Sequence, residues 1–213
     1  MIVPGGVGMD IEATQLELIA EELKRVKDIY ADMVHIMSEK SNFLNRIRTT
    51  GIIRKQTAED LSMVGVGARA SGVARDSRKD MGFGIYDELD FAVVTKVNGD
   101  VEARIHVRID EVEQSMDIVR QLLYLLREEK GELKVDLGEL KTLEGAWGIS
   151  ESPRGDNLHW LMLDEVGKIE RLFIRSASYP NWPALPIAVQ GDIIPDFPLI
   201  NKSFELCYAC IDR

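Results

Sequence analysis

The sequence predicts an α+β fold that is mainly helical: a bundle of long helices, completed by a partner chain, beside a small antiparallel β-hairpin region. Two observations lead to this prediction. Two long segments repeat apolar residues at alternating steps of three and four, which is the spacing of one helix face. A later segment alternates apolar and polar residues on both sides of a short turn, as in a hairpin. We expect residues 1–213 to form one domain.

The first long helix is expected over residues 10–45, where Asp10 offers an N-cap after a glycine-rich loop. Its apolar stripe consists of Leu16, Ile19, Leu23, Val26, Tyr30, Met33 and Met37. The second long helix is expected over residues 101–129. Its stripe consists of Ile105, Ile109, Val112, Met116, Val119, Leu123 and Leu126. Because the chain supplies only two such helices, we expect the remaining helices of the bundle to come from another polypeptide.

Residues 49–91 are expected to connect the two long helices as a loop region. A short helix is predicted at Ala58–Met63, and a glycine-rich loop is predicted at residues 65–72. A basic run of Arg75, Arg78 and Lys79 follows it. Such a run is more often structural than catalytic, and a subunit interface is one interpretation of it.

Residues 150–213 are expected to contain the hairpin and then a tail that ends in the two cysteines. Strands are predicted at 157–163 and 168–175, after an irregular stretch at 134–148. The tail has prolines at 180, 183, 186, 195 and 198, so we expect it to be extended, with one short helix.

Composition excludes several classes of function. The net charge of −10 disfavours binding to nucleic-acid phosphates or to an anionic membrane surface. No apolar run approaches the ~18 residues of a membrane span, and the N-terminus does not have the pattern of a secretory signal. The only cysteines, Cys207 and Cys210, do not form a disulfide framework, which indicates a reducing compartment.

A Cys-x-x-Cys pair can bring two thiolates to one metal or to each other. From the spacing alone, half of a metal site, a redox dithiol and two unrelated buried thiols are equally good interpretations. The three histidines, His35, His106 and His159, do not pair at ligand spacing, so a complete metal site within this chain is not expected.

A second candidate is Arg154, which lies in the segment Glu151-Ser152-Pro153-Arg154-Gly155. An arginine on a Pro–Gly loop at the start of a strand can be held rigidly while its guanidinium stays free for an anionic or metal-bound group. A surface arginine in a turn is the commoner alternative.

These segments together resemble a family. The segment E-S-P-R-G-x-x-x-H-W is similar to the E-A-P-R-G-x-x-x-H-W motif of nickel–iron hydrogenase large subunits, and S-F-E-L-C-Y-A-C is similar to their terminal S-F-D-P-C-x-A-C. The motif G-x-x-A-R-A-S-G-V-x-x-D-x-R-K-D and the terminal Asp-Arg resemble a sister branch. That branch contains membrane-bound, energy-converting hydrogenases and the homologous 49-kDa-type subunit of respiratory NADH:quinone oxidoreductase. The resemblance runs through nearly the whole chain.

The resemblance implies roles for several residues. Cys207 would match the terminal nickel ligand and Cys210 the thiolate that bridges nickel and iron, and soft thiolates suit both metals. Arg154 would match the arginine beside the diatomic ligands of the iron, with Pro153 and Ser178 also at the cofactor. The remaining implied residues belong to a candidate coupling loop between redox chemistry and ion pumping: Arg69, Asp76 and Arg78.

The resemblance also implies partners. The family binds its centre through two Cys-x-x-Cys pairs, and only the second is present here. We therefore expect a nickel–iron centre shared with a partner chain, the N-terminal half of the large subunit, which carries the first pair. Iron–sulfur clusters are expected on a small-subunit partner and not in this chain. Membrane-arm subunits would hold the complex at the cytoplasmic face of the cell membrane, with this chain peripheral.

Four functions remain after these steps. The leading one is a subunit of a membrane-bound, ferredoxin-linked complex that reduces protons to hydrogen. Glu205-Leu206 replaces the family's Asp-Pro before the first cysteine, which makes a related sulfane sulfur or polysulfide reductase a serious alternative. A quinone-reducing respiratory-type subunit is the third, although such proteins have generally lost the cysteines that Cys207 and Cys210 represent. A module that serves assembly alone ranks last because it leaves the cysteines without a function.

Overall fold

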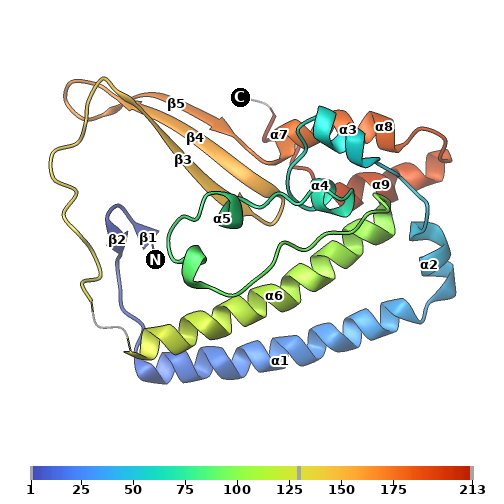
Figure 1. Ribbon diagram of the computed structural model, residues 1–213, viewed down its shortest axis with the longest axis horizontal. Coiled ribbons are helices and arrows are strands. Elements are labelled where there is room, and N and C mark those ends of the chain that lie inside the picture. The colour runs from blue at the N-terminus through green and yellow to red at the C-terminus, as the bar shows by residue number, and fades with distance from the viewer. Residues whose placement is uncertain (1, 129–130, 212–213) are drawn as a thin grey trace.

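The computed structural model describes residues 2–128 and 131–211 (Figure 1). The predicted helix end at Glu129 and the terminal Asp212-Arg213 motif lie outside these residues. The helices are α1 (Ala13–Ser38), α2 (Ser41–Ile47), α3 (Lys55–Asp60), α4 (Gly65–Ala70), α5 (Ser77–Asp80), α6 (Val101–Glu128), α7 (Ser178–Asn181), α8 (Leu185–Ala188) and α9 (Phe197–Phe204), with 3-10 turns η1 (Tyr86–Glu88), η2 (Trp182–Ala184) and η3 (Ile194–Asp196). The strands are β1 (Ile2–Val3), β2 (Gly6–Val7), β3 (Gly145–Ser152), β4 (Gly155–Leu163) and β5 (Ile169–Arg175). This confirms the predicted α+β class.

The two long helices, α1 and α6, lie side by side and run in opposite directions (Figure 1). The prediction of one helix over 10–45 was wrong at both ends. The N-cap is Glu12, whose backbone N–H donates to the Gln15 side chain, and Asp10 lies outside the helix. The helix ends at Ser38, whose hydroxyl donates to the carbonyl oxygen of His35, and α2 then starts in a new direction.

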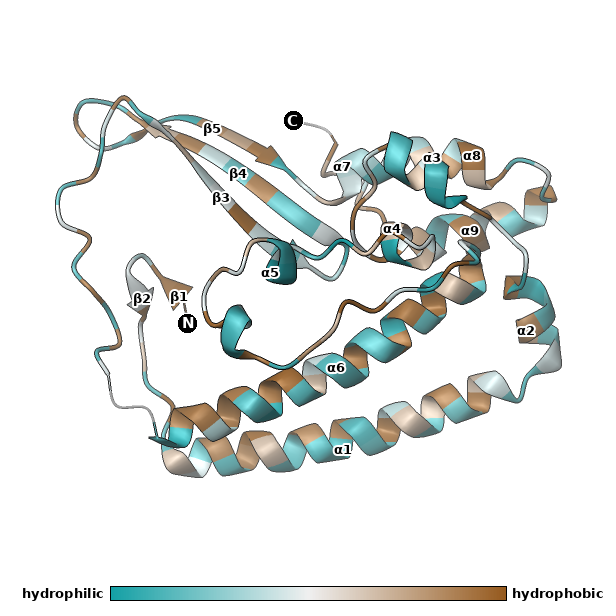
Figure 2. Ribbon diagram, in the orientation of Figure 1, coloured by the Kyte–Doolittle hydropathy of each residue, from teal (hydrophilic) through white to brown (hydrophobic). Residues whose placement is uncertain are grey.

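Apolar residues recur along the whole of α1 (Figure 2), and their burial divides them into two seams. One seam, which includes the buried Leu16 and the half-buried Leu23 and Tyr30, belongs to the predicted stripe. The second is exposed and repeats at heptad spacing. It contains Ile19, Val26 and Met33, which were predicted to lie in the same stripe as Leu16, together with Ile29 and Ile36. Exposed apolar seams of this length normally mark an interface. The second seam is therefore consistent with a bundle that another chain completes.

The glycine-rich segment at 65–72 is not the predicted loop but begins with the buried helix α4. Its glycines serve close packing. A Cβ on Gly67 would lie 2.9 Å from the Met63 side chain and 3.4 Å from the Phe204 ring. The short helix predicted at Ala58–Met63 lies slightly earlier, as α3. The prediction of a connecting loop over 49–91 was therefore wrong in part, because four short helical segments occupy it.

The β-region is a three-stranded antiparallel sheet in the order β3-β4-β5. Strands β4 and β5 confirm the predicted hairpin, but β3 occupies part of the stretch that was predicted to be irregular. Two glycines in Gly145-Ala146-Trp147-Gly148 weaken its strand signal. Pairing with β4 stabilises β3 as a strand. Trp147 faces Trp160 across the two strands, and Gly145 leaves room for the Trp160 ring.

The proline-rich tail is mainly short helical segments, contrary to the predicted extended chain. Its prolines occupy first-turn positions, where the missing N–H costs no hydrogen bond: Pro183 in η2, Pro186 in α8, Pro195 in η3 and Pro198 in α9. These segments pack on the largest core cluster, which includes Ile53, Met63, Val101, Ile200 and Phe204. The core therefore lies directly beneath the residues that precede the cysteines. None of the helices in 2–128 and 131–211 combines the length and apolarity of a membrane span.

Candidate metal centre

Arg154 lies in the tight turn between β3 and β4, and two glycines place that turn against α4. Gly65 has φ +64° and Gly155 has φ +124°, so both adopt left-handed backbone. A Cβ on Gly65 would lie 2.0 Å from the carbonyl oxygen of Arg154, and one on Gly155 would lie 2.7 Å from the backbone nitrogen of Gly65. The backbones therefore meet with no side chain between them. The start of α4 determines where the Arg154 turn lies.

The same start of α4 is anchored from the other side by Asn181 of α7. The Asn181 amide accepts from the N–H of Val64 at 3.0 Å and donates to the Val64 carbonyl oxygen at 3.0 Å. Asn181 is buried, so both bonds are shielded from water. The tail and the Arg154 turn are thus positioned on one short helix.

We call Glu205–Cys210 the thiol segment. It follows α9 directly, and Glu205 has the left-handed φ of +54° that ends the helix. Leu206 is buried in the main core cluster. The next residue, Cys207, makes hydrogen bonds through both polar groups of its backbone. Its N–H donates to Ser178 Oγ at 3.0 Å, and its carbonyl oxygen accepts from Trp182 Nε1 at 3.3 Å. The tail therefore supplies two polar contacts that fix the first cysteine.

Arg104 holds α9 in place behind the thiol segment. It is fully buried on α6 and donates to Ser203 Oγ at 2.9 Å and to the carbonyl oxygens of Gly51 and Gly99. Its guanidinium also lies 4.1 Å from the centre of the Phe204 ring. These contacts join the last turn of α9 to the first turns of α6.

The structure brings Arg154 to the thiol segment. Its Nε donates to the carbonyl oxygen of Glu205, and its side chain is otherwise exposed. A hydrogen bond with the Cys210 thiol lowers the pKa of the Cys207 thiol, and backbone N–H groups and the charge of Arg154 lower it further. Neither cysteine is in a disulfide, and both are half-buried. The site therefore favours a thiolate at Cys207.

This arrangement predicts how Cys207 reacts with iodoacetamide in metal-free protein. A lowered pKa means that its alkylation should reach half its maximal rate below the ordinary thiol pKa of about 8.5. Cys210→Ala removes the hydrogen bond that lowers the pKa most, so the midpoint for Cys207 should move to higher pH. Mass spectrometry can follow each cysteine separately. An unchanged midpoint in Cys210→Ala would contradict the assignment.

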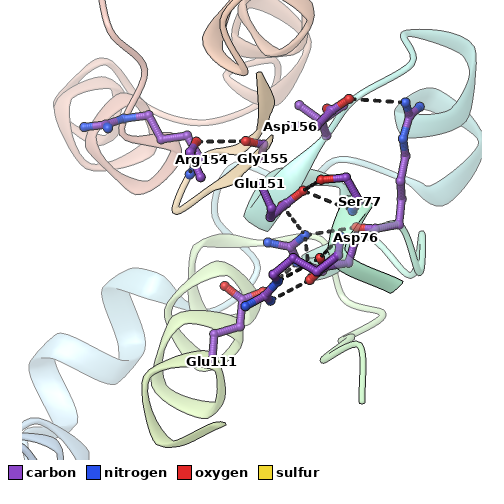
Figure 3. Close-up of polar contacts among 12 residues, drawn as sticks. Asp76, Ser77, Glu111, Glu151, Arg154, Gly155 and Asp156 are labelled. Carbon is purple, nitrogen blue, oxygen red and sulfur yellow. Dashed lines mark hydrogen bonds and ion pairs between the residues drawn. The ribbon is translucent and has the colours of Figure 1, made fainter. Parts of the chain in front are cut away.

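Arg69, Asp76 and Arg78 lie in a second group of charged side chains, which also contains Glu111 and Glu151. We call these five residues the Arg69 cluster. Arg69 Nε donates to Glu111 Oε1 at 2.6 Å, and its Nη1 donates to Glu151 Oε1 at 3.0 Å. Arg78 contacts both carboxylate oxygens of Asp76, at 2.9 and 2.7 Å. Figure 3 shows Glu111 and Glu151 converging from different elements, whereas Arg154 extends away from them.

The predicted site residues thus fall into two places. Cys207, Cys210, Arg154 and Ser178 come together at the thiol segment. Pro153 lies in the Arg154 turn and lines a cavity that also reaches the Arg69 cluster. Sequence reasoning missed the residues that support these positions: Gly65, Arg104, Glu111, Asn181 and Trp182. Their roles depend on partners distant in sequence, although the Glu of E-S-P-R-G was a visible signal for Glu151.

The donor set fits two ligands of a metal centre. Cys207 and Cys210 offer two soft sulfur donors close enough to hydrogen-bond, with a cation beside them. Within 2–128 and 131–211 there is no group of three or more His, Cys, Asp or Glu side chains that could hold a metal ion.

Comparison with known proteins identifies the family. The family model of the respiratory-chain NADH dehydrogenase 49-kDa subunit matches residues 1–144 and 139–213. The chain belongs to this family. A solved relative, the membrane-bound sulfane sulfur reductase, an archaeal respiratory membrane complex, shares the fold at a TM-score of 0.89 and 31% identity, over 99% of this chain and 59% of the matched chain.

Proteins similar to this chain include hydrogenases. Formate hydrogenlyase subunit 5 of Escherichia coli K12 is 34% identical over 212 residues, covering 98% of this chain and 36% of the relative. The carbon monoxide-induced hydrogenase of Rhodospirillum rubrum is 29% identical over 212 residues, covering 98% of this chain and 58% of the relative. The predicted resemblance to hydrogenase large subunits and to the 49-kDa subunit is confirmed. The chain spans less than two thirds of the length of each of these relatives.

Proposed function

We propose that this chain is part of the catalytic subunit of a membrane-bound, ferredoxin-linked oxidoreductase complex that reduces protons to hydrogen. The paired thiols beside Arg154 are the observation that supports this proposal most directly. Cys207 and Cys210 would hold two coordination positions of a nickel–iron centre, with Ser178 and Pro153 beside it. Such a centre, when bound, supplies the site at which two electrons and two protons combine.

The chain's own residues would prepare that site. The backbone at Cys207 is fixed by two hydrogen bonds: its N–H donates to Ser178 and its carbonyl oxygen accepts from Trp182, so its sulfur has a defined position. The Arg154 guanidinium, held at its Nε by the Glu205 carbonyl oxygen, keeps its remaining N–H groups for the ligands of a metal or for the substrate. Its charge favours the thiolate form that binds metal.

The proposal also includes partners. A chain that carries the first Cys-x-x-Cys pair would complete the centre, and its helices would cover the exposed α1 seam of Ile19, Val26, Ile29, Met33 and Ile36. An iron–sulfur small subunit would deliver electrons. Membrane-arm subunits would hold the complex at the cytoplasmic face of the membrane, and the Arg69 cluster is the candidate for coupling the redox step to ion movement.

The decisive experiment is metal analysis of the complex purified with its native partners. We expect nickel and iron in the wild type, hydrogen production from reduced ferredoxin, and loss of both nickel and turnover in Cys207→Ser. Serine keeps the size of the side chain but replaces the soft sulfur ligand. Absence of nickel in an active wild-type complex would overturn the proposal. The control, Ser38→Ala at the exposed end of α1, should keep its nickel.

A second candidate is reduction of sulfane sulfur, and the likeness to the archaeal sulfane sulfur reductase favours it. In that reaction two electrons cleave an S–S bond and the released sulfur leaves as sulfide after taking up protons. Glu205-Leu206 stands where the resemblance would place Asp-Pro, and this departure from the hydrogenase motif also favours the second candidate. Sulfide production from polysulfide without hydrogen production would select this function.

A further inference from the structure

A cavity of about 320 Å³ joins the Arg69 cluster to the thiol segment. Arg69, Arg78 and Glu111 line one part of it, and Pro153 and Glu205 line another. Glu205 lies two residues before Cys207. The cavity has room for several water molecules, and its walls offer many polar partners to them. Its lining includes neither cysteine, so it offers protons a water path from the cluster as far as Glu205, at the start of the thiol segment.

The Arg69 cluster contains more acids than bases. Its two cations, Arg69 and Arg78, face three carboxylates, those of Asp76, Glu111 and Glu151. All five side chains are buried or largely buried. A surplus negative charge in such surroundings is costly, and one bound proton removes it.

Hydrogen bonding decides which acid takes the proton. Glu151 accepts from Arg69 and from both the N–H and the hydroxyl of Ser77. Burial opposes ionisation of Asp76, but the bonds from Arg78 prevail and lower its pKa. At Glu111 burial is the larger effect and raises the pKa, although Arg69 opposes it. Glu111 is therefore the member of the cluster that most readily holds a proton.

The neighbours of Glu111 set its charge environment from every side. They are Arg69 of α4, Asp76 and Arg78 of α5, Tyr86 of η1, Glu151 of β3, Arg108 of α6 itself and Glu205 after α9. Arg108 lies 3.9 Å from the Glu205 carboxylate, which also pairs with Lys202 at 3.1 Å, so Glu205 balances the Arg108 charge only in part. Burial still outweighs the nearby cations at Glu111 and raises its pKa.

We propose that Glu111 holds a proton at one end of this cavity and delivers it through cavity water toward the thiol segment. This inference rests on the proposed function, yet it applies to either acceptor, because hydrogen production and sulfur reduction both consume protons. The proton leaves the carboxyl group of Glu111, and the carboxylate that remains is stabilised by Arg69 at 2.6 Å. The proton ends on the substrate that ferredoxin-derived electrons reduce, and solvent then reprotonates Glu111.

The test compares Glu111→Gln with Glu113→Gln in the intact complex. Glutamine keeps the size of Glu111 and can accept from Arg69 but cannot release a proton, while Glu113 is exposed on the same helix. We expect Glu111→Gln to lower kcat at least tenfold with KM for the acceptor unchanged, because proton transfer by a positioned group contributes ~10²–10⁴-fold. Reduction of the iron–sulfur clusters by the donor should stay at the wild-type rate. Glu111→Asp should recover part of kcat.

An infrared measurement separates this inference from the proposed function, since it needs no turnover. At neutral pH the wild type and Glu113→Gln should show the carbonyl stretch of a protonated carboxyl group that Glu111→Gln lacks. A wild type without that band overturns the role of Glu111 whatever the complex reduces. An active complex with unchanged kcat in Glu111→Gln also overturns it. If Glu111→Gln does not assemble, a shifted band in Glu111→Asp supports the assignment and an unshifted one contradicts it.

Discussion

Replacing Arg69 by methionine should lower the free energy of unfolding by about 3–5 kcal/mol at neutral pH, the cost of removing one partner from a buried ion pair. The Arg69 side chain is 2% exposed and contacts the carboxylates of Glu111 and Glu151. Burial alone would lower its pKa, but these carboxylates raise it. Methionine fills similar space and leaves Arg78 as the only cation among the five positions of the cluster. Urea denaturation followed by tryptophan fluorescence measures the loss.

Two comparisons separate the contribution of charge to the stability loss of Arg69→Met from the contribution of packing. Arg75→Met removes a neighbouring arginine whose side chain is 48% exposed and whose partner Asp156 keeps Arg175, so it should cost under about 1 kcal/mol. The deficit of Arg69→Met should also shrink at lower pH. Arg69 is one of the cations that hold the pKa of Asp76 low, so the wild type loses that stabilisation as falling pH protonates Asp76. The variant lacks Arg69 and has less of this stabilisation to lose. Equal losses in Arg69→Met and Arg75→Met would refute the buried-charge account.

Gly65→Ala should displace Arg154 from its working position although it leaves the Arg154 side chain unchanged. The new Cβ would lie 2.0 Å from the Arg154 carbonyl oxygen and 2.6 Å from the Gly155 nitrogen, and backbone atoms cannot rotate away as a side chain can. The turn must move by the order of 1 Å, and a displacement of that size can cost about 10²-fold in turnover. We therefore expect kcat in Gly65→Ala to approach that of Arg154→Ala while the complex still assembles.

The control for this variant is Gly84→Ala. Gly84 has nearly the same backbone conformation, φ +61°, but nothing lies within 4 Å of its Cβ position. It should therefore show only the cost of placing alanine in left-handed backbone, about 1–2 kcal/mol, with turnover unchanged. Wild-type turnover in Gly65→Ala would show that contact with α4 does not position Arg154.

The helices and the hairpin could be predicted because their signals are local. The apolar spacing of α6 and the alternation in β4 and β5 each lie within one segment. The errors have the opposite origin. Gly65 and Gly67 indicate a loop when considered alone, and they form a helix because α4 must lie against the Arg154 turn and the Phe204 ring. The tail prolines indicate extended chain but occupy the first turns of short helices that the core holds in place.

For the candidate site, sequence motifs were enough to indicate the family and the residues that could meet a metal: Cys207, Cys210 and Arg154. These are motifs whose members lie within a few residues of one another. Tertiary structure alone decided that Arg154 reaches the Glu205 carbonyl oxygen and that Arg69 joins Glu111 and Glu151. The partners in those contacts are 42 to 82 residues apart, and hydrogen bonds and burial depend on distance in space, which local sequence patterns do not record.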